Sequence, residues 1–294
     1  MTKDPLLYFS QAACKALLYE VTLTPKPGLV DCANDGSHSD MTLSTFIDST
    51  AALIAHFYRY LRIGYDHASL EPQLLFNLLR QEGIAAEQSM FEVTKGINTH
   101  KGVNFSFALL LGATGSYLAQ HPEKSETAIF TADDTVAICK LVKPLTKHLI
   151  DQDLHHLSKK EHLTYGEELF LKYGIKGPRG EAASGYPSLT QHALPFLREE
   201  ASKTSDNKYL QLKLLLHLMT FVEDANLIHR GGMSALRAIQ KETKEIEAEN
   251  LSPSALCQKL TNYNDHLVRL HLSPGGSADL LALSLYFAFL ENII

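Results

Sequence analysis

Apolar side chains recur every three or four residues along almost the whole chain, and alternating runs of β-branched residues are almost absent. This spacing places side chains on one face of an α-helix, whereas a strand requires alternation. We therefore predict an all-α protein in which Gly and Pro residues separate the helices. The predicted helices cover residues 6–21, 41–63, 71–94, 103–119, 127–150, 162–173, 188–200, 209–228, 233–249, 253–270 and 277–290.

The predicted helices are joined by short polar segments rather than by linkers. Residues 121–126 and 202–208 are predicted to be surface loops, and His155 and His156 a solvated pair between helices. A chain of 294 residues with 45% hydrophobic residues can bury a large core. We expect a single α-helical catalytic domain over residues 1–294.

The charge and the apolar segments exclude several classes of partner. A net charge of −6 argues against a nucleic-acid-binding surface, which needs basic residues. Residues 280–290 form the longest apolar stretch, too short for a bilayer and typical of a buried core helix. The first residues lack signal-peptide character, and the four cysteines form no CxxC pair. We expect a cytoplasmic protein with reduced thiols that binds no membrane.

The glycines cluster in five polar, charged segments: residues 25–31, 96–102, 174–181, 223–232 and 273–279. Glycine lets backbone N–H groups approach an anion closely. Lys and Arg neutralise phosphate charge, while Asp and Glu hold Mg²⁺ beside phosphates. The five segments together indicate a nucleotide-polyphosphate site built at helix ends.

The last segment, residues 273–279, has the clearest physical means of binding a phosphate. Residues 273–277 open directly into an apolar helix, whose N-terminus presents free N–H groups to a phosphate. Asp279 could hold a metal beside that phosphate. The alternative is that Ser277 is only an N-cap and Asp279 only favours the helix dipole. Asp224 and Asn226 follow the apolar residues 210–222, so they are either paired or metal-bound in the core, or exposed where that helix ends.

Five motifs occur in an order that closely resembles the triphosphoribosyl-dephospho-CoA synthase family, from about Leu17 to Leu290. They are EVTLTPKPGLVD at 20–31, NTHKG at 98–102, RGE at 179–181 with GYP at 185–187, DxN at 224–226 with RGG at 230–232, and LSPGGSADL at 272–280. Cys32 departs from the family pattern, because an Arg is common there.

The resemblance implies an all-α enzyme that joins ATP to 3′-dephospho-CoA at its 2′-hydroxyl and releases adenine. The product resembles the prosthetic-group precursor of the acyl carrier protein of citrate lyase or malonate decarboxylase, which a separate holo-acyl-carrier-protein transferase would attach. Mg²⁺ is the expected cofactor, bound together with ATP.

The resemblance and the loop chemistry together give a set of predicted site residues. A carboxylate, Asp31 or Glu181, would be the general base, and His100 or another acidic group would protonate the departing adenine. The predicted metal ligands are Glu20, Asp224 and Asp279. The predicted substrate-binding residues are Lys26, His38, Asn98, Lys101, Arg179, Asn226, Arg230, Ser273, Gly275, Gly276 and Ser277.

Two other classes of function remain open at the level of sequence. A helical hydrolase that cleaves N-ribosyl bonds, such as an ADP-ribosyl hydrolase, would use water and need no second nucleotide. A non-catalytic nucleotide-binding or scaffold protein would bind ATP without consuming it. The prominence of basic loops favours two phosphorylated substrates over either alternative. No P-loop or dinucleotide-binding glycine motif follows a strand.

Overall fold

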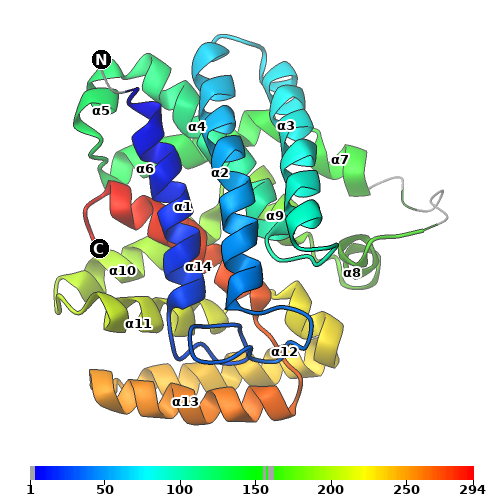
Figure 1. Ribbon diagram of the computed structural model, residues 1–294, viewed down its shortest axis with the longest axis vertical. Helices are drawn as coiled ribbons and strands as arrows, with labels where there is room; N and C mark the ends of the chain where they lie inside the picture. The colour runs from blue at the N-terminus through cyan, green and yellow to red at the C-terminus, as the bar shows by residue number, and fades with distance from the viewer. Residues whose placement is uncertain (1–3, 155–156, 158–161) are drawn as a thin grey trace.

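The structure, a computed structural model, describes residues 4–154, 157 and 162–294, and these residues are helical apart from their connections (Figure 1). They contain fourteen α-helices and one π-helix and no β-strand, which confirms the predicted all-α class. The predicted pair His155 and His156 lies outside the described residues. The elements are α1 (Leu6–Thr22), α2 (Leu43–Asp66), α3 (Pro72–Val93), α4 (Lys101–Gln120), α5 (Pro122–Thr127), α6 (Ala132–Leu145), α7 (Leu149–Leu154), α8 (Tyr165–Tyr173), α9 (Gly177–Ser184), the π-helix η2 (Ser188–Ala193), α10 (Leu194–Ala201), α11 (Asn207–Met219), α12 (Ala225–Ala248), α13 (Pro253–Arg269) and α14 (Gly275–Leu290).

Several predicted boundaries were wrong. Residues 121–126 are not a loop, because most of them form α5. Residues 127–150 split into α6 and α7, since α6 contains Pro144 near its end and proline cannot continue the backbone ladder. Residues 188–200 begin as the π-helix η2, just before Pro195 at the start of α10. Proline lacks an N–H and crowds the preceding turn, which accounts for the wider winding there.

Residues 209–228 were predicted to be one helix, but the chain leaves the helix at Thr220 and starts α12 at Ala225. Asp224 is the N-cap of α12, so a capping carboxylate ends the break. Helix α12 then bends at Gly232, whose φ is 73°. The break and the bend lie in a segment that places Glu223, Ala225, Asn226, His229 and Arg230 on the surface of the cavity described below.

Helices α2 and α4 pack with their backbones in close approach. A Cβ on Gly64 of α2 would lie 1.9 Å from the carbonyl oxygen of Gly112 in α4. A Cβ on Gly115 would lie 2.1 Å from the carbonyl oxygen of Leu61. Glycine is therefore required at this crossing by space rather than by backbone conformation.

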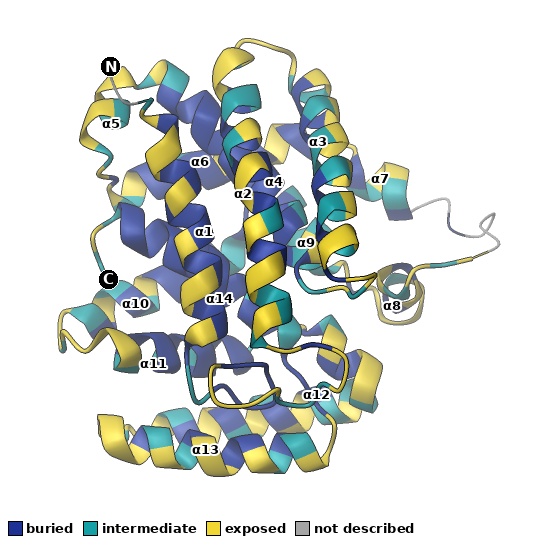
Figure 2. Cartoon of the chain, in the orientation of Figure 1, coloured by how far each residue is buried: buried dark blue, intermediate teal, exposed yellow. Residues whose placement is uncertain are grey.

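Helices α4 and α14 form the centre of the molecule, as the burial pattern in Figure 2 shows. Helix α14 packs against α1, α4, α11 and α12, and buried apolar side chains from Leu6 to Leu290 form one cluster. The prediction of a buried core helix over residues 280–290 is confirmed.

Helix α4 is the one helix in the described part of the chain that is long and apolar enough to cross a membrane by length and composition. Of its most apolar stretch, 83% is buried inside the protein, as in the core helix of a globular protein.

Candidate active site

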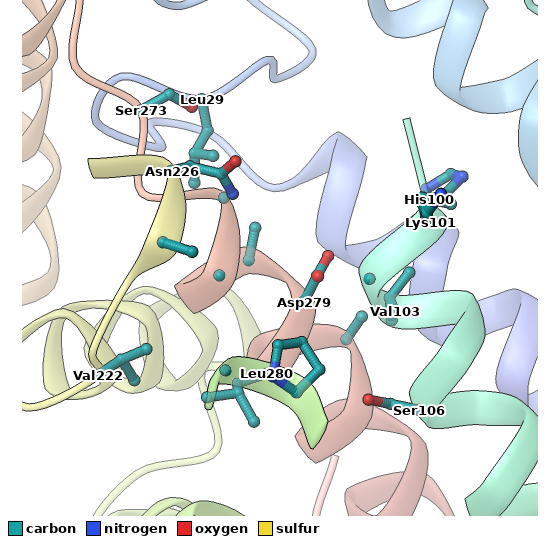
Figure 3. A pocket seen from close by; sticks show the side chains of 18 of the residues that line it. Leu29, His100, Lys101, Val103, Ser106, Val222, Asn226, Ser273, Asp279 and Leu280 are labelled. Carbon is teal, nitrogen blue, oxygen red and sulfur yellow. The ribbon is translucent and has the colours of Figure 1, made fainter. Parts of the chain in front are cut away.

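A cavity of about 740 Å³ lies where the N-terminal ends of α4, α9, α12 and α14 meet the end of α1 and the loop that follows it. Figure 3 shows Asp279 pointing into it, with Asn226 and Ser273 on one side and His100 and Lys101 on the other. Most predicted site residues line this cavity: Glu20, Lys26, His38, Asn98, His100, Lys101, Glu181, Asn226, Arg230, Ser273, Gly275, Gly276 and Asp279. The structure thus brings together groups that lie more than 250 residues apart in the chain.

Asp224 joins the first turns of α12 and α14. Its Oδ1 accepts hydrogen bonds from the backbone N–H groups of Asn226 and Leu227, at 3.0 and 3.2 Å. Its Oδ2 accepts from the backbone N–H of Ser277 at 2.9 Å and from the Ser277 hydroxyl at 3.2 Å. Burial raises the pKa of Asp224 and these N–H donors oppose the rise. Both oxygens therefore bind helix ends, and neither Asp224 nor Ser277 lines the cavity.

The first turn of α14 depends on its glycines. A Cβ on Gly275 would lie 2.4 Å from the side-chain nitrogen of Asn226, and one on Gly276 would lie 3.2 Å from the Asp224 carboxyl carbon. Helix α14 begins after Pro274, so the idea that Ser277 is its N-cap was wrong. The open N-terminus of α14 faces the cavity through Ser273 and these two glycines.

Asp279 lies deeper, in the second turn of α14. A Cβ on Gly102 would lie 2.3 Å from Oδ2 of Asp279. The Asp279 side chain therefore packs against the first turn of α4, which contains Gly102. Burial raises the pKa of Asp279 well above its ordinary value, and the nearby charges of Glu20 and Asp224 act in the same direction. Among the described residues, none donates a hydrogen bond to this carboxylate. Of the three predicted metal ligands, Asp279 is therefore the one that stays available to a ligand in the cavity.

Glu20 and Lys26 form a buried ion pair on the wall of the cavity, with side chains 7% and 2% exposed. The Lys26 ammonium donates to Oε1 of Glu20. Burial raises the pKa of Glu20, and the positive charge of Lys26 opposes that rise. An unpaired charge would be costly at such a depth, so each group compensates for the burial of the other.

His100 is buried beside the ion pair. Its Nδ1 lies 2.7 Å from the Ser49 hydroxyl, which itself accepts a hydrogen bond from Thr99 at 2.7 Å. Ser49 therefore donates to Nδ1, which leaves the proton of the neutral ring on Nε2. Nε2 is buried without a hydrogen-bond partner in the described residues. Burial, with a contribution from Lys26, lowers the pKa of His100 to about 3, so the ring is neutral at neutral pH.

Basic and polar groups form the opposite rim. Arg230 donates to the carbonyl oxygens of Ser37 and His271 at 2.7 and 3.1 Å, and to Nδ1 of His38 at 3.2 Å. Since a guanidinium only donates, Nδ1 of His38 accepts and its Nε2–H donates to the Ser273 hydroxyl at 2.9 Å. Burial and the charge of Arg230 lower the pKa of His38 and keep it neutral. The rim is held in place before any ligand binds.

On the other side, Asn98 accepts a hydrogen bond from the backbone N–H of Lys101 at 3.2 Å and so holds the start of α4. The Lys101 ammonium lies 2.6 Å from Glu87 in an exposed ion pair. Exposed pairs of this kind are weak, so Lys101 is free to turn to a phosphate.

Two more predicted residues lie away from the cavity lining. Asp31 accepts hydrogen bonds from the Thr24 hydroxyl and from three backbone N–H groups of its own loop, those of Lys26, Ala33 and Asn34. Arg179 pairs with Asp153 at 3.0 Å. These contacts fix the loop before α2 and helix α9, respectively. The chemical roles predicted for the site residues remain predictions.

The structure adds lining residues that the sequence did not single out, chiefly Phe46, Ser106, Tyr186 and Ser188. Phe46 meets the His100 ring edge to face at 5.1 Å. Ser188 donates to Glu181 through its hydroxyl at 2.7 Å and its backbone N–H at 3.2 Å. None of these residues is charged, so none has the residue type expected of a phosphate- or metal-binding group in the sequence. The one available signal is that Tyr186 belongs to the GYP motif at 185–187.

Comparisons with known proteins identify the family of this chain and several relatives. The family model for ATP:dephospho-CoA triphosphoribosyl transferase matches residues 7–294. A protein of Streptococcus equi subsp. zooepidemicus (strain H70), named "Probable 2-(5''-triphosphoribosyl)-3'-dephosphocoenzyme-A synthase", is 56% identical over 293 residues, covering 99% of both chains. Relatives with the same name from Streptococcus mutans and Streptococcus pyogenes serotype M28 are 54% and 55% identical, covering all of this chain and 99% and 100% of theirs.

No solved structure matches this chain. The family model nevertheless covers almost its whole length, and the relatives share more than half of their aligned residues with it. The chain therefore belongs to the ATP:dephospho-CoA triphosphoribosyl transferase family.

Proposed function

We propose that this protein transfers the triphosphoribosyl group of ATP to the 2′-hydroxyl of 3′-dephospho-CoA and releases adenine. The observation that carries the proposal is one cavity that combines a fixed basic rim, a helix N-terminus and an available carboxylate, in a member of this family. Its volume of about 740 Å³ suits a nucleotide-sized ligand.

The triphosphate fits the part of the cavity that has Arg230 on one side and Lys101 on the other. Lys101 and Arg230 supply positive charge, and the open N-terminus of α14 supplies backbone N–H groups through Gly275 and Gly276. Asn226, beside Gly275, adds an amide donor. These groups would hold the triphosphate in place while the bond between ribose and adenine breaks.

The donor set fits Mg²⁺ when the triphosphate supplies most of the ligands. In the described residues no three His, Cys, Asp or Glu side chains are arranged to hold a metal ion. Of the three predicted ligands, Glu20 is paired with Lys26, Asp224 binds helix ends, and Asp279 is available. Mg²⁺ commonly uses one or two carboxylates together with phosphates and water. Bound at Asp279, it would neutralise charge on the triphosphate.

The reaction breaks a glycosidic bond, and such reactions pass through an oxocarbenium-like transition state. Glu181 is the better candidate for the general base, because it lines the cavity and Asp31 does not. Burial raises the pKa of Glu181, and the Ser188 hydrogen bonds oppose that rise. His100, neutral at neutral pH, would act through its Nε2–H as a hydrogen-bond donor and not as a proton source.

The wider role follows from the chemistry of the product. We propose that triphosphoribosyl-dephospho-CoA passes to a separate holo-acyl-carrier-protein transferase, and that both steps take place in the cytoplasm. A prosthetic-group precursor for citrate lyase or malonate decarboxylase would be used in this way. The family match supports the identity of the product from which this role is inferred.

The test is to incubate the purified protein with ATP, Mg²⁺ and dephospho-CoA and to identify the products by chromatography and mass. Adenine and triphosphoribosyl-dephospho-CoA, formed only when dephospho-CoA is present, are the expected result. Coenzyme A, whose 3′-phosphate lies beside the acceptor hydroxyl, is the matched control. Adenine released without an acceptor would indicate a hydrolase. ATP binding with no adenine under any condition would indicate a binding protein.

A further inference from the structure

Two buried polar atoms on the cavity wall lack a hydrogen-bond partner. In the described part of the chain three buried side-chain atoms are in this state: His100 Nε2, Tyr186 OH and Ser125 Oγ. The first two belong to residues that line the cavity, and Ser125 lies in the peripheral helix α5. Buried polar groups in folded proteins nearly always have partners. An atom of a bound substrate would supply the missing partner in the cavity.

Tyr186 is also held in an unusual backbone conformation. Its φ is 55°, directly after Gly185 with φ of 74° and directly before Pro187. A residue before proline favours extended backbone, and non-glycine residues rarely adopt a positive φ. Hydrogen bonds impose the conformation: the Tyr186 N–H donates to the Glu181 carbonyl at 2.8 Å, and the Tyr186 carbonyl accepts from Leu189 and Thr190. Such conformations concentrate at binding and catalytic sites.

The surroundings of Tyr186 differ from the phosphate side of the cavity. Burial raises the pKa of the Tyr186 hydroxyl, so it stays a neutral donor and acceptor. The Ser106 hydroxyl lies close enough to oppose that rise, but the two groups do not form a hydrogen bond of good geometry. Val103, Leu280 and Leu283 also line the cavity and are buried. In Figure 3, Ser106, Val103 and Leu280 lie on the far side of Asp279 from Ser273 and Asn226. This end suits a flat apolar ring with polar edges rather than a phosphate.

We propose that the Tyr186 hydroxyl hydrogen-bonds the adenine ring of a nucleotide substrate in this apolar end of the cavity. The inference rests on the proposed function, and it adds a specificity-determining residue to it. Both ATP and dephospho-CoA carry adenine, and the binding experiment distinguishes them. Because the hydroxyl forms no hydrogen bond of good geometry in the described residues of the free protein, its removal should change the stability of the fold little and weaken mainly the bound state.

The test variant is Tyr186→Phe, which removes the hydroxyl and keeps the ring. Tyr60→Phe is the matched control, because the Tyr60 hydroxyl is equally buried, donates to Asn104 at 2.9 Å and lies away from the cavity lining. Thermal unfolding without ligand should give an unchanged or higher Tm for Tyr186→Phe and a lower Tm for Tyr60→Phe. A clear loss of Tm in Tyr186→Phe would mean a structural hydroxyl and would overturn the inference.

Binding is then measured calorimetrically for ATP with Mg²⁺ and, separately, for dephospho-CoA. The Kd of one nucleotide should rise about fivefold to tenfold in Tyr186→Phe, as expected for one lost hydrogen bond, and stay unchanged in Tyr60→Phe. The nucleotide that weakens identifies the adenine that Tyr186 contacts. Unchanged Kd values for both nucleotides would overturn the inference.

Inorganic tripolyphosphate, which has no base, distinguishes binding of the triphosphate from binding of the adenine ring. Its Kd should be the same for the wild-type protein and Tyr186→Phe. If the wild-type protein binds and converts both nucleotides and Tyr186→Phe behaves identically, the Tyr186 inference is wrong and the proposed function stands. If the wild-type protein neither binds nor converts the nucleotides, both the proposed function and the Tyr186 inference are wrong.

Discussion

Asp279 and His100 face the same cavity, and burial shifts their pKa values in opposite directions. In both cases the neutral form is favoured, since removing a charge from water is unfavourable unless another charge compensates it. Asp279, which is protonated more readily than an exposed Asp, and the unpartnered Nε2 of His100 are therefore available to a ligand rather than used to stabilise the fold.

Asp279→Asn should abolish turnover and leave the fold intact. Removing the available carboxylate removes its electrostatic contribution, which for a metal-binding group amounts to several kcal/mol, or at least about a hundredfold in kcat. The neutral amide also relieves the repulsion from Glu20 and Asp224, so Tm should stay unchanged or rise. Adenine release and thermal unfolding measure the two effects. Full activity in the variant would remove Asp279 from the site.

His100 should make the protein less stable in mild acid. Its pKa is about 3 in the folded protein against 6.5 as the ordinary value, so between these pH values the unfolded chain binds a proton that the folded chain does not. The free energy of unfolding therefore falls as pH drops below 6.5, by about 2 kcal/mol at pH 5 from this residue alone.

The measurement is urea unfolding at pH 7 and pH 5 for the wild-type protein and His100→Asn, which cannot titrate and can still accept from Ser49. The wild-type protein should lose about 2 kcal/mol more than the variant between the two pH values. Equal losses would show that His100 takes up its proton in the folded state.

At the scale of the elements, the site is built where helix N-termini converge, and Asp224 holds two of them. Asp224→Ala would leave the first turns of α12 and α14 without their shared acceptor. Each lost cap contributes about 1–2 kcal/mol, so we expect a loss of about 3 kcal/mol in the free energy of unfolding. Denaturant unfolding measures it, with Asp279→Asn as the control carboxylate. A stable but inactive Asp224→Ala would support the metal-binding role predicted from sequence.

The crossing of α2 and α4 is a second property of the elements. Gly64→Ala would place a methyl group against the α4 backbone and should destabilise the protein by about 3 kcal/mol. Gly83→Ala in α3 is the control, because its nearest neighbours would lie at 3.9 Å, and alanine favours a helix by about 0.5 kcal/mol. Urea unfolding of both variants compares them. Equal stability of the two would contradict the close approach of α2 and α4.

At the scale of the whole molecule, the cavity lies at the ends of the helices that form the core. Helix α14 is buried along almost its whole length and carries Ser273, Gly275, Gly276 and Asp279 at or near its start. A helix buried in the core thus positions the groups proposed to hold the triphosphate. Rigid support of this kind keeps charged groups in place before the substrate binds, which lowers the reorganisation required during reaction.

The sequence by itself determined the helical class, most helix positions, the family and the polar motifs that line the cavity. Helical periodicity and glycine-rich motifs are local patterns, so they can be read along the chain. Local patterns did not reveal the break between α11 and α12 or the π-helix before Pro195, because the pattern of apolar residues continues across both.

Only the tertiary structure decided which polar groups are available to a ligand. Asp31, Asp224 and Asp279 look alike in the sequence, yet Asp31 and Asp224 accept hydrogen bonds from backbone N–H groups and Asp279 does not. Tyr186 gave no charge signal, and its unpartnered hydroxyl became visible only with its surroundings. The physical reason is that a hydrogen bond depends on the distance and angle between groups far apart in the chain, which residue type and spacing do not specify.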